Sequence, residues 1–320
     1  MPSYDFSAIG FLVLDVLCRY AEEMPPPGGA TFVEEITMTV AGTAGATAVD
    51  CAILGLNGQL VARVGKDEMG DFLRNKIAEY GVNTDLVQID DKVQTSASML
   101  PIRPDGSRCG FFVPGTTETL NIIPDQFDAV LDAEIIHLGG SGLLTALDGA
   151  PSLALLKRAK EIGRTTVFDL IQATPETIAC VQPLLPYIDY FVPSIVEAAA
   201  MAGESDPAAV ASWFKSQGVK NAVITLEGDG VWVDPEDGAP FHLPAHKIDV
   251  VDTTGCGDSF TAGIITGLSK GWEIQEAARF ANAVAANVAL GLGSMGKLTS
   301  FEATVESMNT WPLRQSSDLS

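Results

Sequence analysis

The sequence VVDTTGCGDSFTAGI, residues 250–264, places several small residues around a turn. The run before it, 247–251, predicts a strand, and the run after it, 259–268, predicts a helix with apolar residues four apart. Gly255 and Gly257 let the backbone turn sharply and approach a ligand with no Cβ in the way. Free amides at a helix start carry the positive end of the helix dipole. The stretch therefore predicts an anion-binding cradle.

Asp258 follows the glycines directly, although a carboxylate repels a phosphate. Its position is explained if it accepts the proton of a hydroxyl that attacks a bound phosphate. The amides of Gly255, Cys256 and Gly257 would meanwhile stabilise the charge growing on the transferred group. A helix cap is the other common role for an aspartate at such a position. The whole pattern favours phosphoryl transfer to a hydroxyl, with Asp258 as the general base.

Short β-branched runs alternate with longer helical patterns along the chain, which predicts a parallel sheet covered by helices on both faces. The predicted strands are 5–17, 59–65, 134–140, 164–170, 189–194 and 221–228, and the predicted helices are 67–81, 150–163 and 206–218. Within these helices, Asp206 is placed to cap, and Gly81 and Gly218 are placed to end a helix.

Two stretches look like strands without helices, at 30–40 and 93–113, and the second contains a Pro-Asp-Gly turn at 104–106. Strand-only insertions in an α/β chain predict a small flap beside the main sheet, built from about 12–40 and 92–116. We interpret residues 1–310 as one α/β domain and 311–320 as a flexible tail.

The composition narrows the possible partners and compartment. Lys and Arg total 19 against 41 Asp and Glu, a formal charge of −22 that disfavours binding to nucleic acid. The five cysteines never form a C-x-x-C pair, which favours a reducing compartment over a zinc or disulfide framework. No basic signal segment and no membrane-length apolar run is found. These features predict a cytoplasmic protein.

DTTGCGDSF resembles the C-terminal signature of the ribokinase-like (PfkB) carbohydrate kinases, whose usual form is DTTGAGDSF. The stretch 41–70 resembles the N-terminal signature of that family, and the resemblance extends along nearly the whole chain. It implies a three-layer α/β/α fold with a β-strand lid. It also implies an enzyme that transfers a phosphoryl group from ATP, with Mg²⁺, to a hydroxyl of a sugar.

The resemblance assigns substrate-binding roles near the N-terminus. Asp15 matches the acid that contacts sugar hydroxyls, Gly42 matches a glycine of the N-terminal signature, and Thr43 follows it as a further residue expected to hold the substrate. Two positions depart from that signature, since Ala41 replaces its first glycine and Ala46 replaces the asparagine that usually binds substrate. The second departure removes a polar contact and leaves the substrate open.

The resemblance also assigns nucleotide and metal positions. Glu197 matches the glutamate that organises magnesium and phosphate waters, and Ser194 replaces the asparagine of the same motif. Asp252 and Thr254 match a monovalent cation site, for which K⁺ is a candidate. Further positions implied beside the nucleotide are Thr225, Gly228, Gly230 and Asn282.

Several alternatives stay open at this point. A nucleoside kinase of the same family keeps the chemistry and changes the acceptor, whereas a silent nucleotide- or sugar-binding protein would have no need of Asp258. A nicotinamide-dependent oxidoreductase rests only on GLGSMG at 291–296, which follows a helical pattern.

We interpret Phe111 and Phe112 as flap packing rather than a stacking platform. Arg103 and Arg108 would contact an anionic group of the substrate or lie in solvent. The exposed flap strands could pair edge to edge with a second subunit, which predicts a homodimer.

Overall fold

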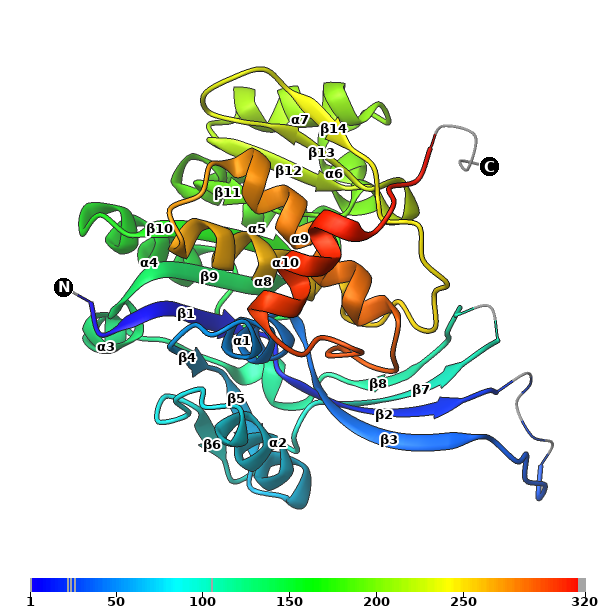
Figure 1. Ribbon diagram of the computed structural model, residues 1–320. Coiled ribbons are helices and arrows are strands. Elements are labelled where there is room, and N and C mark those ends of the chain that lie inside the picture. Colours follow the sequence, from blue (N-terminus) through cyan, green and yellow to red (C-terminus); the bar gives the residue numbers. More distant parts are fainter. Residues whose placement is uncertain (1, 22, 24, 26, 105, 316–320) are drawn as a thin grey trace.

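The computed structural model describes residues 2–21, 23, 25, 27–104 and 106–315, and it has three layers, helices–sheet–helices (Figure 1). Within these residues eight strands form the central sheet in the order β14-β13-β12-β11-β10-β9-β1-β4. All neighbours from β12 to β4 pair in parallel, and β13 and β14 add an antiparallel edge. The strands are β1 Tyr4–Gly10, β4 Gly58–Val61, β9 Ala133–Ser141, β10 Thr165–Leu170, β11 Tyr190–Phe191, β12 Asn221–Thr225, β13 Val231–Asp234 and β14 Phe241–Leu243.

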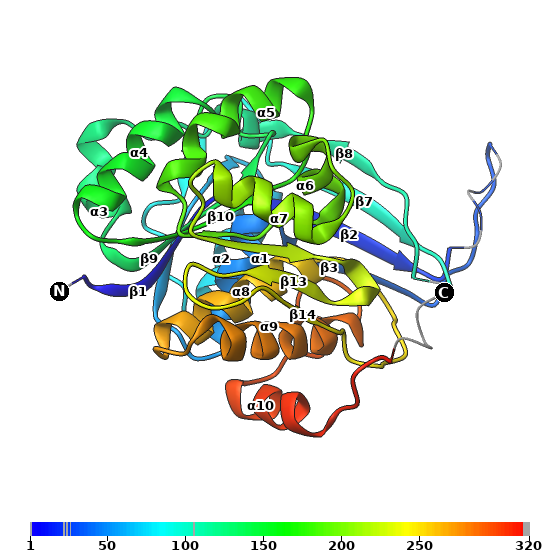
Figure 2. The same cartoon turned by 90° about the horizontal axis from the view of Figure 1, so that it is seen from above.

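Helices cover both faces of this sheet, as Figure 2 shows from above. One face packs against α3 Phe127–Val130, α4 Ala150–Glu161, α5 Pro175–Val181, α6 Ile195–Ala202 and α7 Pro207–Ser216. The other packs against α1 Thr43–Ile53, α2 Glu68–Glu79, α8 Cys256–Ser269 and α9 Ile274–Ala289, with α10 Phe301–Thr310 outermost on α9. The predicted α/β class and its parallel sheet are confirmed.

Local sequence explains where the helices begin. The side chains of Asp67 and Asp206 cap α2 and α7, accepting hydrogen bonds from the amides of Gly70 and Ala209 at 2.8 and 3.0 Å. The predicted cap at Asp206 is thus confirmed. Helix α8 lies close to α9 because Gly263 offers no side chain where it meets Ala281. This close contact fixes the direction in which the start of α8 points.

A second sheet lies beside the carboxyl ends of the central strands (Figure 1). Its order is β3-β2-β7-β8, with β2 Val13–Arg19, β3 Glu35–Ala41, β7 Ala97–Ile102 and β8 Phe111–Val113. The predicted flap therefore exists as a separate sheet, although Asp105 of the predicted turn lies outside the described residues. A short parallel pair, β5 Arg63–Gly65 and β6 Gln88–Asp90, lies near α2.

The single strand predicted over 5–17 was wrong, because the chain changes sheets within it. β1 ends at Gly10, whose φ of 132° is allowed to glycine, and β2 begins at Val13. A Cβ on Gly10 would collide with the carbonyl of Gly139 on the neighbouring strand. This break matters for the site, since it places Asp15 on the second sheet rather than on the central one.

Two further predictions need correction. Residues 247–251 form no strand but an extended loop before α8, in which Ile248 is half-buried and Val250 is 46% exposed. Residues 311–315, assigned to a flexible tail, instead run along 245–247, and the Lys247 amide donates to the Pro312 carbonyl at 2.8 Å. Residues 316–320 of that tail lie outside the described residues.

Candidate active site

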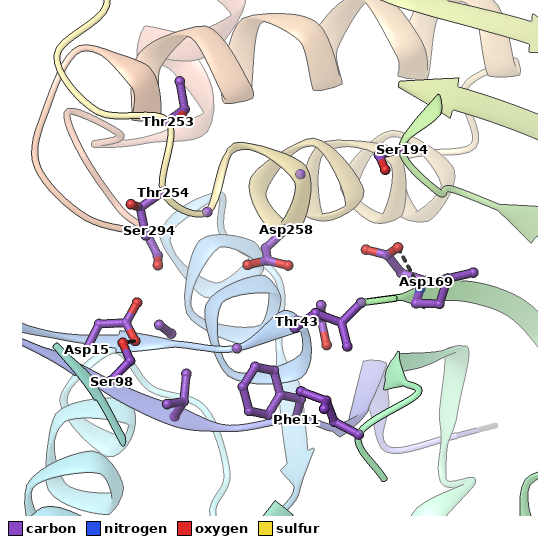
Figure 3. A pocket seen from close by; sticks show the side chains of 18 of the residues that line it. Phe11, Asp15, Thr43, Ser98, Asp169, Ser194, Thr253, Thr254, Asp258 and Ser294 are labelled. Carbon is purple, nitrogen blue, oxygen red and sulfur yellow. Dashed lines mark hydrogen bonds between the residues drawn. The ribbon is translucent and has the colours of Figure 1, made fainter. Parts of the chain in front are cut away.

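A cavity of about 410 Å³ lies where the central sheet meets the second sheet. Its walls come from the carboxyl ends of β10, β11 and β12, the segment after β1, the starts of α1 and α8, and the strands β2, β7 and β8. Figure 3 shows its side chains converging from these elements. The carboxyl edge of a parallel sheet is the usual ligand site of such folds, so the cavity lies where the topology predicts.

The start of α8 forms one wall of the cavity as an open backbone cradle. Gly255 is the first residue of the turn, with a left-handed φ of 77°, and no side chain in the described part of the chain caps the helix. A Cβ on Gly255 would lie 2.6 Å from the Cα of Ser294, so only glycine fits. At Gly257 a Cβ would meet no described atom within 4 Å beyond its chain neighbours and its own helix backbone. The space in front of the amides is therefore free for an anion.

Asp258 points from the third position of α8 into this cavity (Figure 3). It is not the helix cap, since Gly255 occupies that position. Burial raises the pKa of Asp258 to about 7, and the nearby charge of Asp15 adds to the rise while Arg108 opposes it. The hydroxyl of Thr47 on α1 donates to the Asp258 carbonyl at 3.1 Å, which ties the two helix starts together.

Asp15 reaches the cavity from β2 on the second sheet and accepts a hydrogen bond from the Ser98 hydroxyl at 2.6 Å. Burial raises the pKa of Asp15 to about 6, and the Ser98 hydrogen bond and the charge of Arg108 limit the rise. Ser98 was not predicted from sequence. Its role depends on the pairing of β2 with β7, which places Ser98 directly beside Asp15.

Glu197 lines the cavity from α6 and is also part of a helix cap. One of its carboxylate oxygens accepts from the Ser194 amide at 2.9 Å and from the Ser194 hydroxyl. Burial raises the pKa of Glu197. Asp169, at the end of β10, lines the same cavity and was missed by sequence reasoning. Burial and the charge of Glu197 raise its pKa, and the available signal was an acid that ends an otherwise apolar strand.

Asp252 joins the loop before α8 to the loop after α9. Its carboxylate is buried and accepts from the amide and hydroxyl of Thr254 at 2.9 and 2.7 Å and from the Gly293 amide at 2.9 Å. Thr254 lines the cavity and Asp252 does not. These bonds hold the cradle in place, and a monovalent cation here stays a prediction.

Of the other sequence-predicted positions, some line the cavity and some lie apart from it. Gly42 and Thr43 line it, but Ala46 is buried within α1 and does not. Thr225 lines it, whereas Gly228 is covered by the Arg314 guanidinium, whose Nη1 donates to the Gly228 carbonyl at 2.6 Å. Gly230, whose φ is 99°, ends a short turn, and Asn282 donates from its side chain to the Pro244 carbonyl at 2.7 Å. The Cys256 side chain does not line the cavity, and its thiol donates instead to the Ala285 carbonyl of α9 at 3.7 Å.

The sequence matches the family model described as pfkB family carbohydrate kinase over residues 8–299. The chain belongs to this family. A sugar kinase of Archaeoglobus fulgidus is 29% identical over 234 residues, covering 73% of this chain and 91% of that protein. The aminoimidazole riboside kinase of Salmonella typhimurium is 26% identical over 286 residues, covering 85% of this chain and 84% of that protein.

Solved structures give the same fold. The structure of Arabidopsis thaliana ribokinase complexed with ribose and ATP superimposes with a TM-score of 0.79 at 21% identity, covering 96% of this chain and 99% of that one. The protein is accordingly a PfkB carbohydrate kinase with the ribokinase-like fold. The nicotinamide-dependent alternative gains no support, because its motif at 291–296 follows helix α9 rather than a strand.

No helix among the described residues has the length and apolar character needed to span a membrane. All five cysteines are free thiols. The cytoplasmic location stays a prediction.

Proposed function

We propose that this PfkB kinase transfers the γ-phosphoryl group of ATP to a hydroxyl of a sugar-like acceptor bound between Asp15 and Asp258. The observation that carries the proposal is the juxtaposition, in one cavity, of an open backbone cradle at Gly255–Gly257 with a carboxylate of raised pKa. The cradle suits an anion and the carboxylate suits a proton acceptor. A phosphoryl transfer to a hydroxyl uses both.

In this mechanism Asp258 accepts the proton of the acceptor hydroxyl while the hydroxyl oxygen forms its bond to the γ-phosphorus. The bond from that phosphorus to the departing ADP oxygen breaks in the same displacement. The amides at the start of α8 stabilise the charge on the transferred group, and Asp15 orients the acceptor by accepting from another of its hydroxyls. A base with a pKa near 7 is well matched to this task at neutral pH.

The carboxylates at the far side of the cavity suit a divalent cation. Asp169 lines the cavity from β10 and Glu197 lines it from the start of α6, and the charge of Glu197 contributes to the raised pKa of Asp169. Oxygen donors of this kind are the ligands that Mg²⁺ takes, directly or through water. When bound, Mg²⁺ would neutralise phosphate charge. We keep Ser194, Thr225 and Glu197 as the residues proposed to lie beside the phosphates of ATP.

We propose that the second sheet acts as a lid. Asp15, Ser98 and Phe112 belong to it and line the cavity, and Arg108 reaches across to the core, where its Nη1 donates to the Thr253 hydroxyl at 3.0 Å. Closure over the acceptor would exclude water, which otherwise competes as a phosphoryl acceptor.

We further propose that the outer face of the lid pairs with a second copy of the chain. Strand register aligns Met38, Val16 and Met99 in one row across it, and Ile36, Met38 and Met99 are 68, 51 and 59% exposed. Light scattering should report a dimer, and Met38→Glu should shift it to a monomer. A monomeric wild-type protein would contradict this assignment.

The acceptor proposal is tested by ADP release with MgATP across sugars, sugar acids, sugar phosphates and nucleosides. One acceptor class should be phosphorylated, and Asp258→Asn should lower kcat about 10²- to 10⁴-fold with ATP binding retained, the usual scale for loss of a general base. Asp206→Asn is a suitable control, because Asp206 caps α7, a role that asparagine also performs, and does not line the cavity. Near-normal kcat in Asp258→Asn would refute its role.

A further inference from the structure

The cavity has an apolar wall that a simple sugar does not require. The residues Phe11, Phe112, Leu143 and Ile171 line it, and we call them the apolar wall. Figure 3 shows Phe11 on the side of the cavity that faces α8 and Asp258. A free sugar presents hydroxyls in nearly every direction, so an aliphatic and aromatic surface of this kind leaves some of them without partners.

An aromatic pair forms the centre of the apolar wall. Phe11 follows β1 in the core and Phe112 lies on β8 in the lid, yet their ring centroids are 5.8 Å apart at an interplanar angle of 85°. Phe11 is 5% exposed, whereas Phe112, which also lines the cavity, is 44% exposed. The interpretation of Phe112 as flap packing was therefore incomplete. A free aromatic face beside a ligand site suits a planar partner.

The charge of the cavity disfavours an anionic acceptor. Four carboxyl groups line it, on Asp15, Asp169, Glu197 and Asp258. Among the lining residues that the structure describes, Arg108 is the only cation, and it already donates to Thr253. The triphosphate of ATP would bring further negative charge to the same space. An acceptor with its own phosphate or carboxylate would add repulsion without a second cation to offset it.

One polar group at the floor of the cavity, the Thr43 hydroxyl, is unused. Gly139 and Gly140 of β9 lie behind it, and a Cβ on either would lie 2.9 Å from the Thr43 hydroxyl oxygen, so the two glycines leave room for this side chain. That oxygen is buried and has no hydrogen-bond partner among the described residues. Thr43 lines the cavity beside Phe11 (Figure 3). A ligand that reaches this floor would find one hydrogen-bonding group next to the apolar wall.

From these four observations we infer that the acceptor is an uncharged sugar carrying a planar aromatic group, of the nucleoside type. Its sugar lies between Asp15 and Asp258, and its ring lies against Phe112 and Phe11, with Thr43 able to bond a ring or sugar heteroatom. The inference rests on the proposed function and specifies the acceptor of the same site.

The test compares kcat/KM for ribose with kcat/KM for adenosine, inosine, cytidine and uridine, all with MgATP. At least one nucleoside should exceed ribose by about 100-fold or more, since stacking of a base and burial of its apolar area both add to affinity. Preference for ribose over every nucleoside would overturn the inference and leave the kinase function intact. Absence of phosphoryl transfer to any of the five, and to every other hydroxyl compound screened, would overturn the proposed function itself.

Adjacent phenylalanines offer a matched pair of variants. Phe112→Ala should lower kcat/KM for the nucleoside about 10- to 100-fold, the range that stacking on an aromatic side chain supplies, and should lower kcat/KM for ribose much less. Phe111→Ala removes the same side chain from the other side of β8, where Phe111 is 61% exposed and absent from the cavity, and should leave both values unchanged. Light scattering and thermal unfolding should show both variants in the wild-type assembly state and folded.

Phe112→Leu tests the aromatic ring separately from the apolar size of the side chain, because leucine keeps the apolar contact and removes the aromatic face. In Phe112→Leu, kcat/KM for the nucleoside should fall nearly as far as it does in Phe112→Ala. Equal losses for ribose and nucleoside in Phe112→Ala, or full activity in Phe112→Leu, would contradict stacking on Phe112.

Discussion

The two sides of the cavity are held in different ways. On the core side, Gly255, Gly257 and Asp258 belong to α8, which packs against α1 and α9 in the interior. On the lid side, Asp15 belongs to a sheet that extends away from the core, and one side-chain hydrogen bond from Ser98 orients it. This difference suggests that the two sides of the cavity have different roles. In the proposed mechanism, phosphoryl transfer uses groups held in the core, and recognition of the acceptor uses groups of the proposed lid.

Filling the cradle should produce the largest effect on the core side. A Cβ at Gly257 would meet no described atom within 4 Å beyond its chain neighbours and its own helix backbone, so we expect Gly257→Val to fold normally while its side chain occupies the anion space. We expect kcat/KM for ATP to fall about 100-fold, because misplacement of reacting groups by about 1 Å costs on this order.

The neighbouring glycine is the control for this prediction. Gly255→Val should lose stability as well as activity, since its φ is 77° and Ser294 lies where the side chain would be. Thermal unfolding and calorimetric titration with MgADP separate the two cases. Wild-type nucleotide affinity in Gly257→Val would show that the phosphates do not contact this backbone.

A smaller effect, of a different kind, is expected on the lid side. Ser98→Ala removes the hydrogen bond that limits the pKa of Asp15, so this pKa should rise above about 6 and more of the carboxyl should be protonated at neutral pH. The acceptor KM should increase about 10-fold at pH 7 and recover partly at higher pH, while kcat changes little.

Ser98→Thr keeps the hydroxyl and should restore the acceptor KM. A loss confined to kcat in Ser98→Ala would place Asp15 in the chemical step and would remove the contrast between the two sides of the cavity.

The smallest effect concerns a buried acid behind the core side. Asp50 on α1 is fully buried, and neither of its carboxylate oxygens has a partner among the described residues. Burial, with the charge of Asp258, raises its pKa well above the ordinary value. The folded state thus keeps a proton that the unfolded state releases above about pH 4, and this lowers stability as the pH rises.

Asp50→Ala should therefore raise the free energy of unfolding by about 1 kcal/mol at pH 8, and the gain should shrink toward pH 4. Urea unfolding at both pH values measures this difference. Lower stability of the variant at every pH would mean that the carboxyl is bonded in the native state.

Local sequence was sufficient to predict much of the core side of the cavity. The cradle at 255–257, Asp258 and the cap at Asp206 each depend on residues within one turn of the chain, so their patterns are readable directly. The strand predicted over 247–251 failed for the opposite reason. Its alternating residues look like a strand, but no neighbouring strand pairs with them.

The lid side was harder to predict because it depends on pairing between distant segments. Asp15 meets Ser98 only through the register of β2 with β7, and Phe11 meets Phe112 only through the arrangement of the two sheets. Asp169 required knowledge of which strand ends face α8. The contacts that Asp15 and Phe11 make therefore emerge only from the tertiary structure, whereas the residues proposed for phosphoryl transfer are visible in one motif.

The pH dependence of kcat/KM tests most directly whether Asp258 is the base. Burial and the charge of Asp15 raise its pKa to about 7, so the carboxyl is protonated and inactive below that value. We therefore expect kcat/KM to fall about tenfold per pH unit below an apparent pKa near 7, at saturating MgATP. A profile that stays flat from pH 8 down to pH 5 would contradict it.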